Sequence, residues 1–154
     1  MTISFHDMHD KERMYSFVGD NGENVHVAIE RLYKWVQDHK FQLKVYSTPV
    51  HPHLAIKWIK TGLVSRQRSI ELCANTKLAT DPIIYGKEKP GAVSKIDMYL
   101  LDGRHRYIRA VHYGAPIIEA YILEPKQWLA FQVTNIPQMS QQQLQRIPVV
   151  SGPR

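Results

Sequence analysis

One stretch of the chain, residues 100–110, most constrains what it can fold into. It runs from the end of an apolar strand through an Asp102-Gly103 turn into the first turns of a helix. Four cationic or titratable side chains follow the turn, and they are Arg104, His105, Arg106 and Arg109. Because a helix N-terminus already holds a partial positive charge, cations there cost stability unless an anion lies among them. Free backbone N–H groups, a glycine and guanidinium groups therefore predict a phosphate site over residues 102–109.

Composition sets limits on the class of protein. A length of 154 residues with 44% hydrophobic side chains predicts one compact domain with a real core. The formal net charge of +6 favours anionic partners, which include nucleotides, nucleic acid and acidic lipid. The single cysteine, Cys73, excludes an internal disulfide and a four-cysteine zinc site. Residues 1–13 lack a signal-peptide core, and no apolar run approaches the ~20 residues that span a bilayer, so we expect a cytoplasmic protein with no membrane segment.

Hydrophobic spacing and turn residues predict a mixed order of helices and strands. Predicted helices begin after Asn24, at Pro52, after Ser65, at Arg104 and at Pro125, and predicted strands cover 41–46, 81–85, 96–101 and 117–123. Gly114 is expected to end the fourth helix in a left-handed cap. The strand, helix and strand over 96–123 predict a parallel, right-handed crossover. Pro82 predicts the start of a strand or an edge strand, and the Gln- and Pro-rich end of the chain predicts an arm or a loosely packed tail.

Three blocks of sequence resemble the ParB/sulfiredoxin superfamily, and they are Asp81–Tyr85, Leu100–Tyr107 and Gly114–Ala120. Members of that superfamily pair a strand holding a Pro-Ile step with a later Gly-x-x-Arg helix start. The resemblance covers about residues 43–123 and implies an α/β (α+β) fold, with a mixed sheet and flanking helices in a single compact domain. Residues 1–42 would then be an N-terminal extension with one helix, and 124–154 a C-terminal helix and tail.

The resemblance also implies a nucleotide-binding turn. In that family the glycine–arginine turn binds the phosphates of a nucleotide, so Gly103 would let the backbone approach the phosphate and Arg106 would be its main ligand. Arg104 and His105 would flank it. The triplet from His105 to Tyr107 is similar to one in sulfiredoxins, but Arg104 stands where those enzymes carry the catalytic cysteine. The chain therefore lacks the nucleophile for sulfinic-acid reduction.

Several of these residues have a structural interpretation beside the functional one. Asp102 is predicted either to cap the new helix or to hold a metal ion that accompanies the nucleotide. His105 can act as a phosphate donor, as a general acid or as a packed core histidine. Arg109 is either a phosphate ligand or one half of an ion pair, and Thr48 lies either at the ligand crevice or in a plain turn. Two further carboxylates, Glu71 and Asp81, are candidates for orienting magnesium or activating a water.

The sequence therefore predicts a ParB-like protein that binds phosphate or a nucleotide such as CTP or ATP, with Mg²⁺ and with hydrolysis of the triphosphate as its reaction. His105 is the candidate catalytic residue. One alternative is a ParB-like nuclease that uses the same cradle on DNA. Another is a non-catalytic interaction protein, acting as a homodimer or on a protein partner through residues 1–42 and 124–154. Stand-alone modules of this superfamily are expected on mobile elements, and a small-molecule phosphotransferase is a further option.

Overall fold

The centre of the protein is a five-stranded sheet. The structure is a computed structural model that describes residues 2–9, 12–18, 24–60, 66–72, 81–87, 98–136, 145–146 and 149–150. The strand order is β10 (Val149–Val150), β6 (Met98–Asp102), β5 (Ile83–Lys87), β7 (Ile117–Leu123) and β4 (Val45–Pro49). β5 is parallel to β7 and antiparallel to β6, and β7 is antiparallel to β4. The predicted mixed α/β sheet is therefore confirmed.

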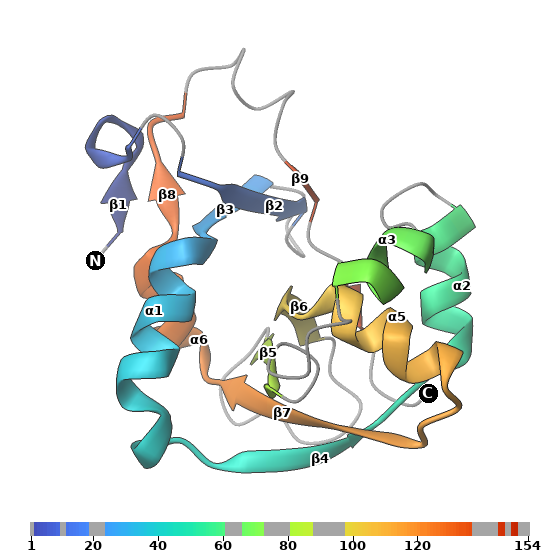
Figure 1. Cartoon of the computed structure of the whole chain (residues 1–154). Coiled ribbons are helices and arrows are strands. Elements are labelled where there is room, and N and C mark those ends of the chain that lie inside the picture. The colour runs from blue at the N-terminus through green and yellow to red at the C-terminus, as the bar shows by residue number, and fades with distance from the viewer. Residues whose placement is uncertain are drawn as a thin grey trace.

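Helices cover both faces of this sheet (Figure 1). One face packs against α1 (Ile29–His39), α6 (Pro125–Trp128) and the short 3-10 helix η3 (Leu129–Phe131). The other face packs against α2 (Pro52–Lys60) and α5 (Arg104–His112), and α3 (Arg66–Leu72) lies on α5. Because side chains alternate along a strand, Ile84 of β5 enters the first core while Ile83 and Tyr85 enter the second. The flanking helices predicted from the sequence are thus confirmed.

Two smaller sheets join the ends of the chain. β2 (Met14–Val18) and β3 (Asn24–Ala28) form an antiparallel pair, and β9 (Gln145–Arg146) adds to β2. β1 (Ile3–Ser4) is followed by the 3-10 helix η1 (Phe5–Asp7) and pairs with β8 (Val133–Thr134). Of the predicted arm or loosely packed tail, the loosely packed alternative is wrong for β8, β9 and β10, because each of them pairs with a strand from elsewhere in the chain. Backbone pairing, which composition does not reveal, fixes them.

The first predicted helix begins later than its spacing suggested. Residues 24–28 form β3, and the helix begins only at Ile29. Val25 and Val27 also fit period-two alternation, and pairing with β2 decides between the two patterns. The strand predicted over 41–46 is likewise displaced, because residues 40–42 form a 3-10 turn, η2 (Lys40–Gln42), before β4. Ser65 and Cys73 lie outside the described residues.

The predicted parallel crossover is wrong. β5 lies between β6 and β7, antiparallel to the first and parallel to the second, so β6 and β7 run in opposite directions. The physical reason is that β6 pairs back on β5, so β7 joins the sheet on the far side of β5. β5 is also an interior strand, not an edge. Pro82 is tolerated because it stands just before Ile83, where its missing N–H removes no hydrogen bond of the strand ladder.

Other predicted boundaries are confirmed. α2 begins at Pro52, α5 at Arg104 and α6 at Pro125, and Gly114 has the left-handed φ of 70° expected after α5. Trp58 and Trp128 are buried in the two cores, as their helical spacing predicts. Among the helices of the described residues, none is long and apolar enough to cross a membrane.

Candidate functional site

The turn that starts α5 has room only for glycine. Gly103 has a φ of 113°, and a Cβ atom at this position would lie 2.3 Å from Cγ2 of Ile83. The N–H of Tyr107 donates to the Gly103 carbonyl at 2.9 Å, so α5 begins immediately after the glycine. The N–H groups of residues 104–106 consequently have no acceptor within the helix. This turn is an anion-compatible helix start of the kind predicted from the sequence.

Arg106, the predicted main phosphate ligand, already has a carboxylate partner. Its Nη2 donates to Oδ2 of Asp102 at 2.7 Å, and the arginine side chain is only 8% exposed. The guanidinium therefore lies beneath the turn, where Asp102 neutralises it. An anion at the turn would share Arg106 with Asp102, so the more exposed cations around α5 are better placed to receive it.

The carboxylates of Asp81 and Asp102 both act on the phenol of Tyr33. The pKa of Tyr33 on α1 is raised, first by burial and then by the negative charges of Asp81 and Asp102, while Arg106 opposes the shift. Both carboxylates are therefore close enough to act on one phenol. Glu71 on α3 is exposed and accepts a hydrogen bond from Gln67 at 2.9 Å. Asp81 therefore acts on the same phenol as Asp102, whereas Glu71 has a separate partner on α3.

The donor set was tested against Mg²⁺. Within the described ranges no group of three or more His, Cys, Asp or Glu residues could hold a metal ion. Mg²⁺ in phosphoryl-transfer sites is commonly held by one or two carboxylates, and substrate phosphates and waters complete the shell. Asp102 could supply one such carboxylate to an ion that arrives with a nucleotide, although it already pairs with Arg106 at 2.7 Å. The described residues do not form a dedicated metal cage.

The other side of the turn is built by α3. Oγ of Ser69, which is fully buried, lies 2.9 Å from Nδ1 of His105 and orients the imidazole. The pKa of His105 is lowered, first by burial and then by the positive charges of Arg104 and Arg68, with Asp102 acting in the opposite direction. The imidazole is therefore neutral near pH 7 and lies in a region of positive potential to which two helices contribute.

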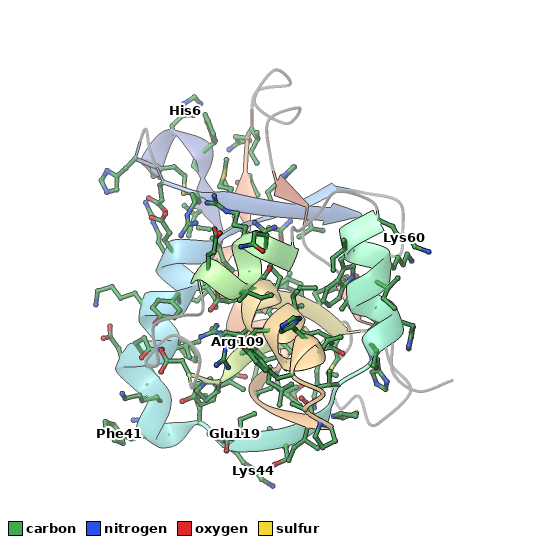
Figure 2. The ribbon with its side chains drawn as sticks, turned by 45° about the vertical axis from the view of Figure 1, so that its right-hand side comes forward. His6, Phe41, Lys44, Lys60, Arg109 and Glu119 are labelled. Carbon is green, nitrogen blue, oxygen red and sulfur yellow. The ribbon has the colours of Figure 1, made fainter. Side chains whose placement is uncertain are left out.

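Two predicted site residues lie apart from this turn. The Arg109 guanidinium lies over the ring of Tyr113, 4.9 Å from its centroid, and so is directed toward the C-terminal end of α5 (Figure 2). Thr48 is buried on β4, and its Oγ1 donates to the carbonyl of Ile118 at 2.8 Å. The structure thus brings residues 102–106 together and directs Arg109 and Thr48 to other partners.

Sequence reasoning missed the contribution of α3. Arg68 and Ser69 belong to a seven-residue helix whose first turn holds no acidic residue. The sequence of this helix also holds two arginines, Arg66 and Arg68, which could have marked it as a candidate for anion binding. Its packing against α5, which brings both residues to His105, is a tertiary contact that no local pattern encodes.

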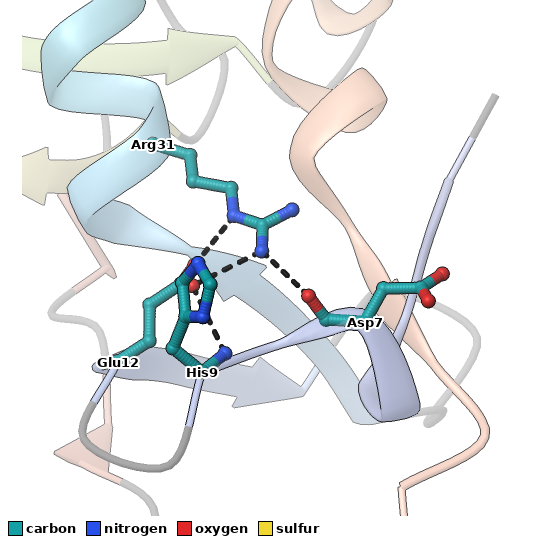
Figure 3. A network of polar contacts seen from close by, with 4 residues as sticks. All are labelled: Asp7, His9, Glu12 and Arg31. Carbon is teal, nitrogen blue, oxygen red and sulfur yellow. Dashed lines mark hydrogen bonds and ion pairs between the residues drawn. The ribbon is translucent and has the colours of Figure 1, made fainter.

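A separate polar network anchors the N-terminal segment to α1 (Figure 3). Arg31 on α1 places Nε 2.7 Å from Oε2 of Glu12, and its Nη2 donates to Oε1 of Glu12 at 3.1 Å. The same Nη2 donates to the carbonyl of Asp7 at 2.8 Å, and the N–H of His9 donates to Glu12. The Glu12 side chain is only 5% exposed, and its Oε2, which has no hydrogen bond, is held by the ion pair with Nε of Arg31, so the network is structural.

Comparisons of the chain with protein-family models, with curated proteins and with solved structures returned no match. The resemblance of residues 43–123 to the ParB/sulfiredoxin superfamily therefore stays a prediction. Any functional conclusion has to come from the chemistry of the α3–α5 site.

Proposed function

We propose that the start of α5, together with α3, binds the phosphate groups of a nucleotide such as CTP or ATP. The observation that carries this proposal is the packing of α3 on the start of α5, where Oγ of Ser69 lies 2.9 Å from Nδ1 of His105. Burial and then the positive charges of Arg104 and Arg68 lower the pKa of that imidazole. Guanidinium groups and a helix N-terminus both favour a multiply charged oxygen ligand. The basic net charge of the chain favours the same class of ligand.

The residues of the site would have different roles in phosphate binding. Arg104 and Arg68 would contact the phosphate oxygens, and the first-turn N–H groups would complete the cradle. Arg106 would stay with Asp102 and hold the turn in shape. A bound phosphate would stabilise the imidazolium form of His105 and raise its pKa, so phosphate binding would take up a proton. Binding should therefore strengthen as the pH falls, down to the pKa of His105 in the free protein, which burial and the neighbouring arginines hold below the ordinary 6.5.

Hydrolysis of the bound triphosphate is proposed as the reaction, with His105 as the candidate general acid. A proton on its imidazole could pass to the leaving phosphate oxygen, and Ser69 would keep the ring oriented. Electrostatic stabilisation by the surrounding cations would be the larger catalytic contribution, because phosphoryl transfer leaves little covalent chemistry to the protein.

The test is a thermal-shift and calorimetric titration of the full chain with CTP, ATP and inorganic triphosphate, each with and without Mg²⁺. A ligand at about ten times its Kd should raise Tm by about 3–6 °C in a chain of this size. Arg104→Ala should weaken binding about tenfold, the loss of one charge-assisted hydrogen bond. Arg109→Ala is the matched control, because it removes the same side chain from the same helix but from the Tyr113 contact.

Two results would refute the proposal. One is the absence of any shift with all three ligands, and the other is an equal loss of affinity in Arg104→Ala and Arg109→Ala. Nicking of a supercoiled plasmid that depends on a divalent metal and on Arg104, without nucleotide binding, would instead assign the cradle to DNA phosphates.

A further inference from the structure

β4 forms an edge of the central sheet and lies at the bottom of the molecule in Figure 1. In the strand order of the described residues it is the last strand, paired with β7 on one side. Four of its five residues are exposed, and Thr48 is the buried one. An edge of this kind presents backbone N–H and C=O groups that can pair with a further strand.

The register of β4 on β7 shows which backbone groups point outward. The N–H of Val50 donates to the carbonyl of Pro116 at 3.0 Å, and this pair directly continues the register of Pro49 opposite Ile117. In an antiparallel ladder, hydrogen-bonded pairs alternate with pairs that are not hydrogen-bonded. The even-numbered residues of β4 therefore bond to β7, and its odd-numbered residues direct their backbone groups away from the sheet.

The outward groups favour one pairing. Val45 and Ser47 each offer an N–H and a C=O, whereas Pro49 has no N–H. A strand that pairs with Val45 and Ser47, and ends before Pro49, leaves no carbonyl facing the proline ring. A second copy of β4 in antiparallel orientation meets this requirement over residues 45–47, with Val45 opposite Ser47 of the other copy, so that each pair exchanges both of its hydrogen bonds.

The side chains of this edge agree with that arrangement. The exposed large hydrophobic residues include Phe41, Val45, Tyr46 and Ile117, which lie on β4, just before it, or on its neighbour β7. Figure 2 shows Phe41, Lys44 and Glu119 along this side of the molecule. Antiparallel pairing centred on Tyr46 would set the two tyrosines against each other, and aromatic cross-strand pairs stabilise sheets. Lys44 would face Thr48, so no like charges oppose one another across the pair.

We propose that β4 is a self-association edge, which pairs with β4 of a second copy of this chain and joins two five-stranded sheets into one. The paired segment is short, so the interface lies at the small end of specific interfaces and the dimer should depend on concentration. Each copy carries a net charge of +6, so added salt should strengthen the dimer by screening the repulsion. A complex with nucleic acid would show the opposite dependence on salt.

Disulfide trapping tests the register. In full-length chains that also carry Cys73→Ser, Tyr46→Cys places two thiols at a non-hydrogen-bonded pair with Cα atoms ~4.5 Å apart, within reach of a disulfide. Lys44→Cys is the matched control on the same face of the strand, but its two Cα atoms would lie ~14 Å apart. We expect mild oxidation to link Tyr46→Cys at least about tenfold faster than Lys44→Cys.

A second measurement covers the case in which the cysteine variant fails to fold. Sedimentation velocity of the wild type should show a dimer that grows with concentration and with salt, and Val45→Lys should abolish it. Ile56→Lys is the control, because Ile56 on α2 is 44% exposed and Val45 is 43% exposed. A wild type that stays monomeric at ~1 mM, equal linking of the two cysteine variants, or a dimer that survives Val45→Lys would overturn the proposal.

Discussion

Replacing Gly103 by alanine should destabilise the protein far more than the same change at Gly114. Both glycines have positive φ, 113° and 70°, so an alanine is strained at either position. They differ in their surroundings. A Cβ at Gly103 would lie 2.3 Å from Cγ2 and 2.6 Å from Cβ of the buried Ile83, whereas nothing lies within 4 Å of a Cβ at Gly114.

The magnitudes follow from these two contributions. Backbone strain at Gly103 costs about 1–3 kcal/mol, and forcing a methyl against the core costs about 1–3 kcal/mol more. Gly103→Ala should therefore lower the free energy of unfolding by about 2–6 kcal/mol, and Gly114→Ala by only about 1–2 kcal/mol. Since domains are stable by about 5–15 kcal/mol, the first loss is a large fraction of the total.

Urea unfolding followed by tryptophan fluorescence measures both variants, because Trp58 and Trp128 are buried and report on the two cores. Equal losses at Gly103 and Gly114 would refute the reasoning, since they would mean that the contact with Ile83 adds nothing. The result also bears on the proposed site. A glycine that the fold itself requires cannot separate binding from stability, which is why the binding test uses Arg104.

Two further predictions concern buried polar groups. In a double-mutant cycle with Glu12→Gln and Arg31→Met, urea unfolding should give a coupling free energy of about 1–2 kcal/mol, because the Glu12 side chain is buried. The exposed Lys34–Asp38 pair should give a coupling free energy of at most about 0.5 kcal/mol. Equal coupling free energies for the two pairs would contradict the structural role of the network. Burial lowers the pKa of His26, whose Nδ1 has no hydrogen-bond partner. The unfolded chain therefore binds the proton first, and the free energy of unfolding should fall as the pH drops below 6.5, the ordinary histidine pKa. Urea midpoints measured over this range should fall less in His26→Gln, and an identical pH dependence would exclude His26 as the cause.

The structure also changes how the cations at the start of α5 are understood. The sequence argument held that cations at a helix N-terminus need an anion beside them. For Arg106 the protein supplies that anion itself, because Asp102 lies one turn earlier in the chain at 2.7 Å. Arg106 alone is therefore no evidence for an external anion, and the proposed site depends on the positive charges of Arg104 and Arg68 beside His105.

The sequence by itself determined the features that depend on neighbouring residues. Pro52 and Pro125 open helices because proline needs no N–H there, and Gly103 and Gly114 frame α5 because only glycine takes those φ angles readily. Alternating and continuous apolar runs likewise marked β5 and β7. These choices are made by energies that act within a few residues.

Only the tertiary structure decided which distant segments meet. The direction of β6 relative to β7, the pairing of the terminal strands and the packing of Ser69 on His105 all join residues far apart in sequence. The spacing of apolar residues over 24–28 fitted a helix as well as a strand. Pairing with β2 makes this segment the strand β3. Non-local hydrogen bonds and buried contacts determine these features. The sequence around a residue does not specify which distant residue it will contact in the fold.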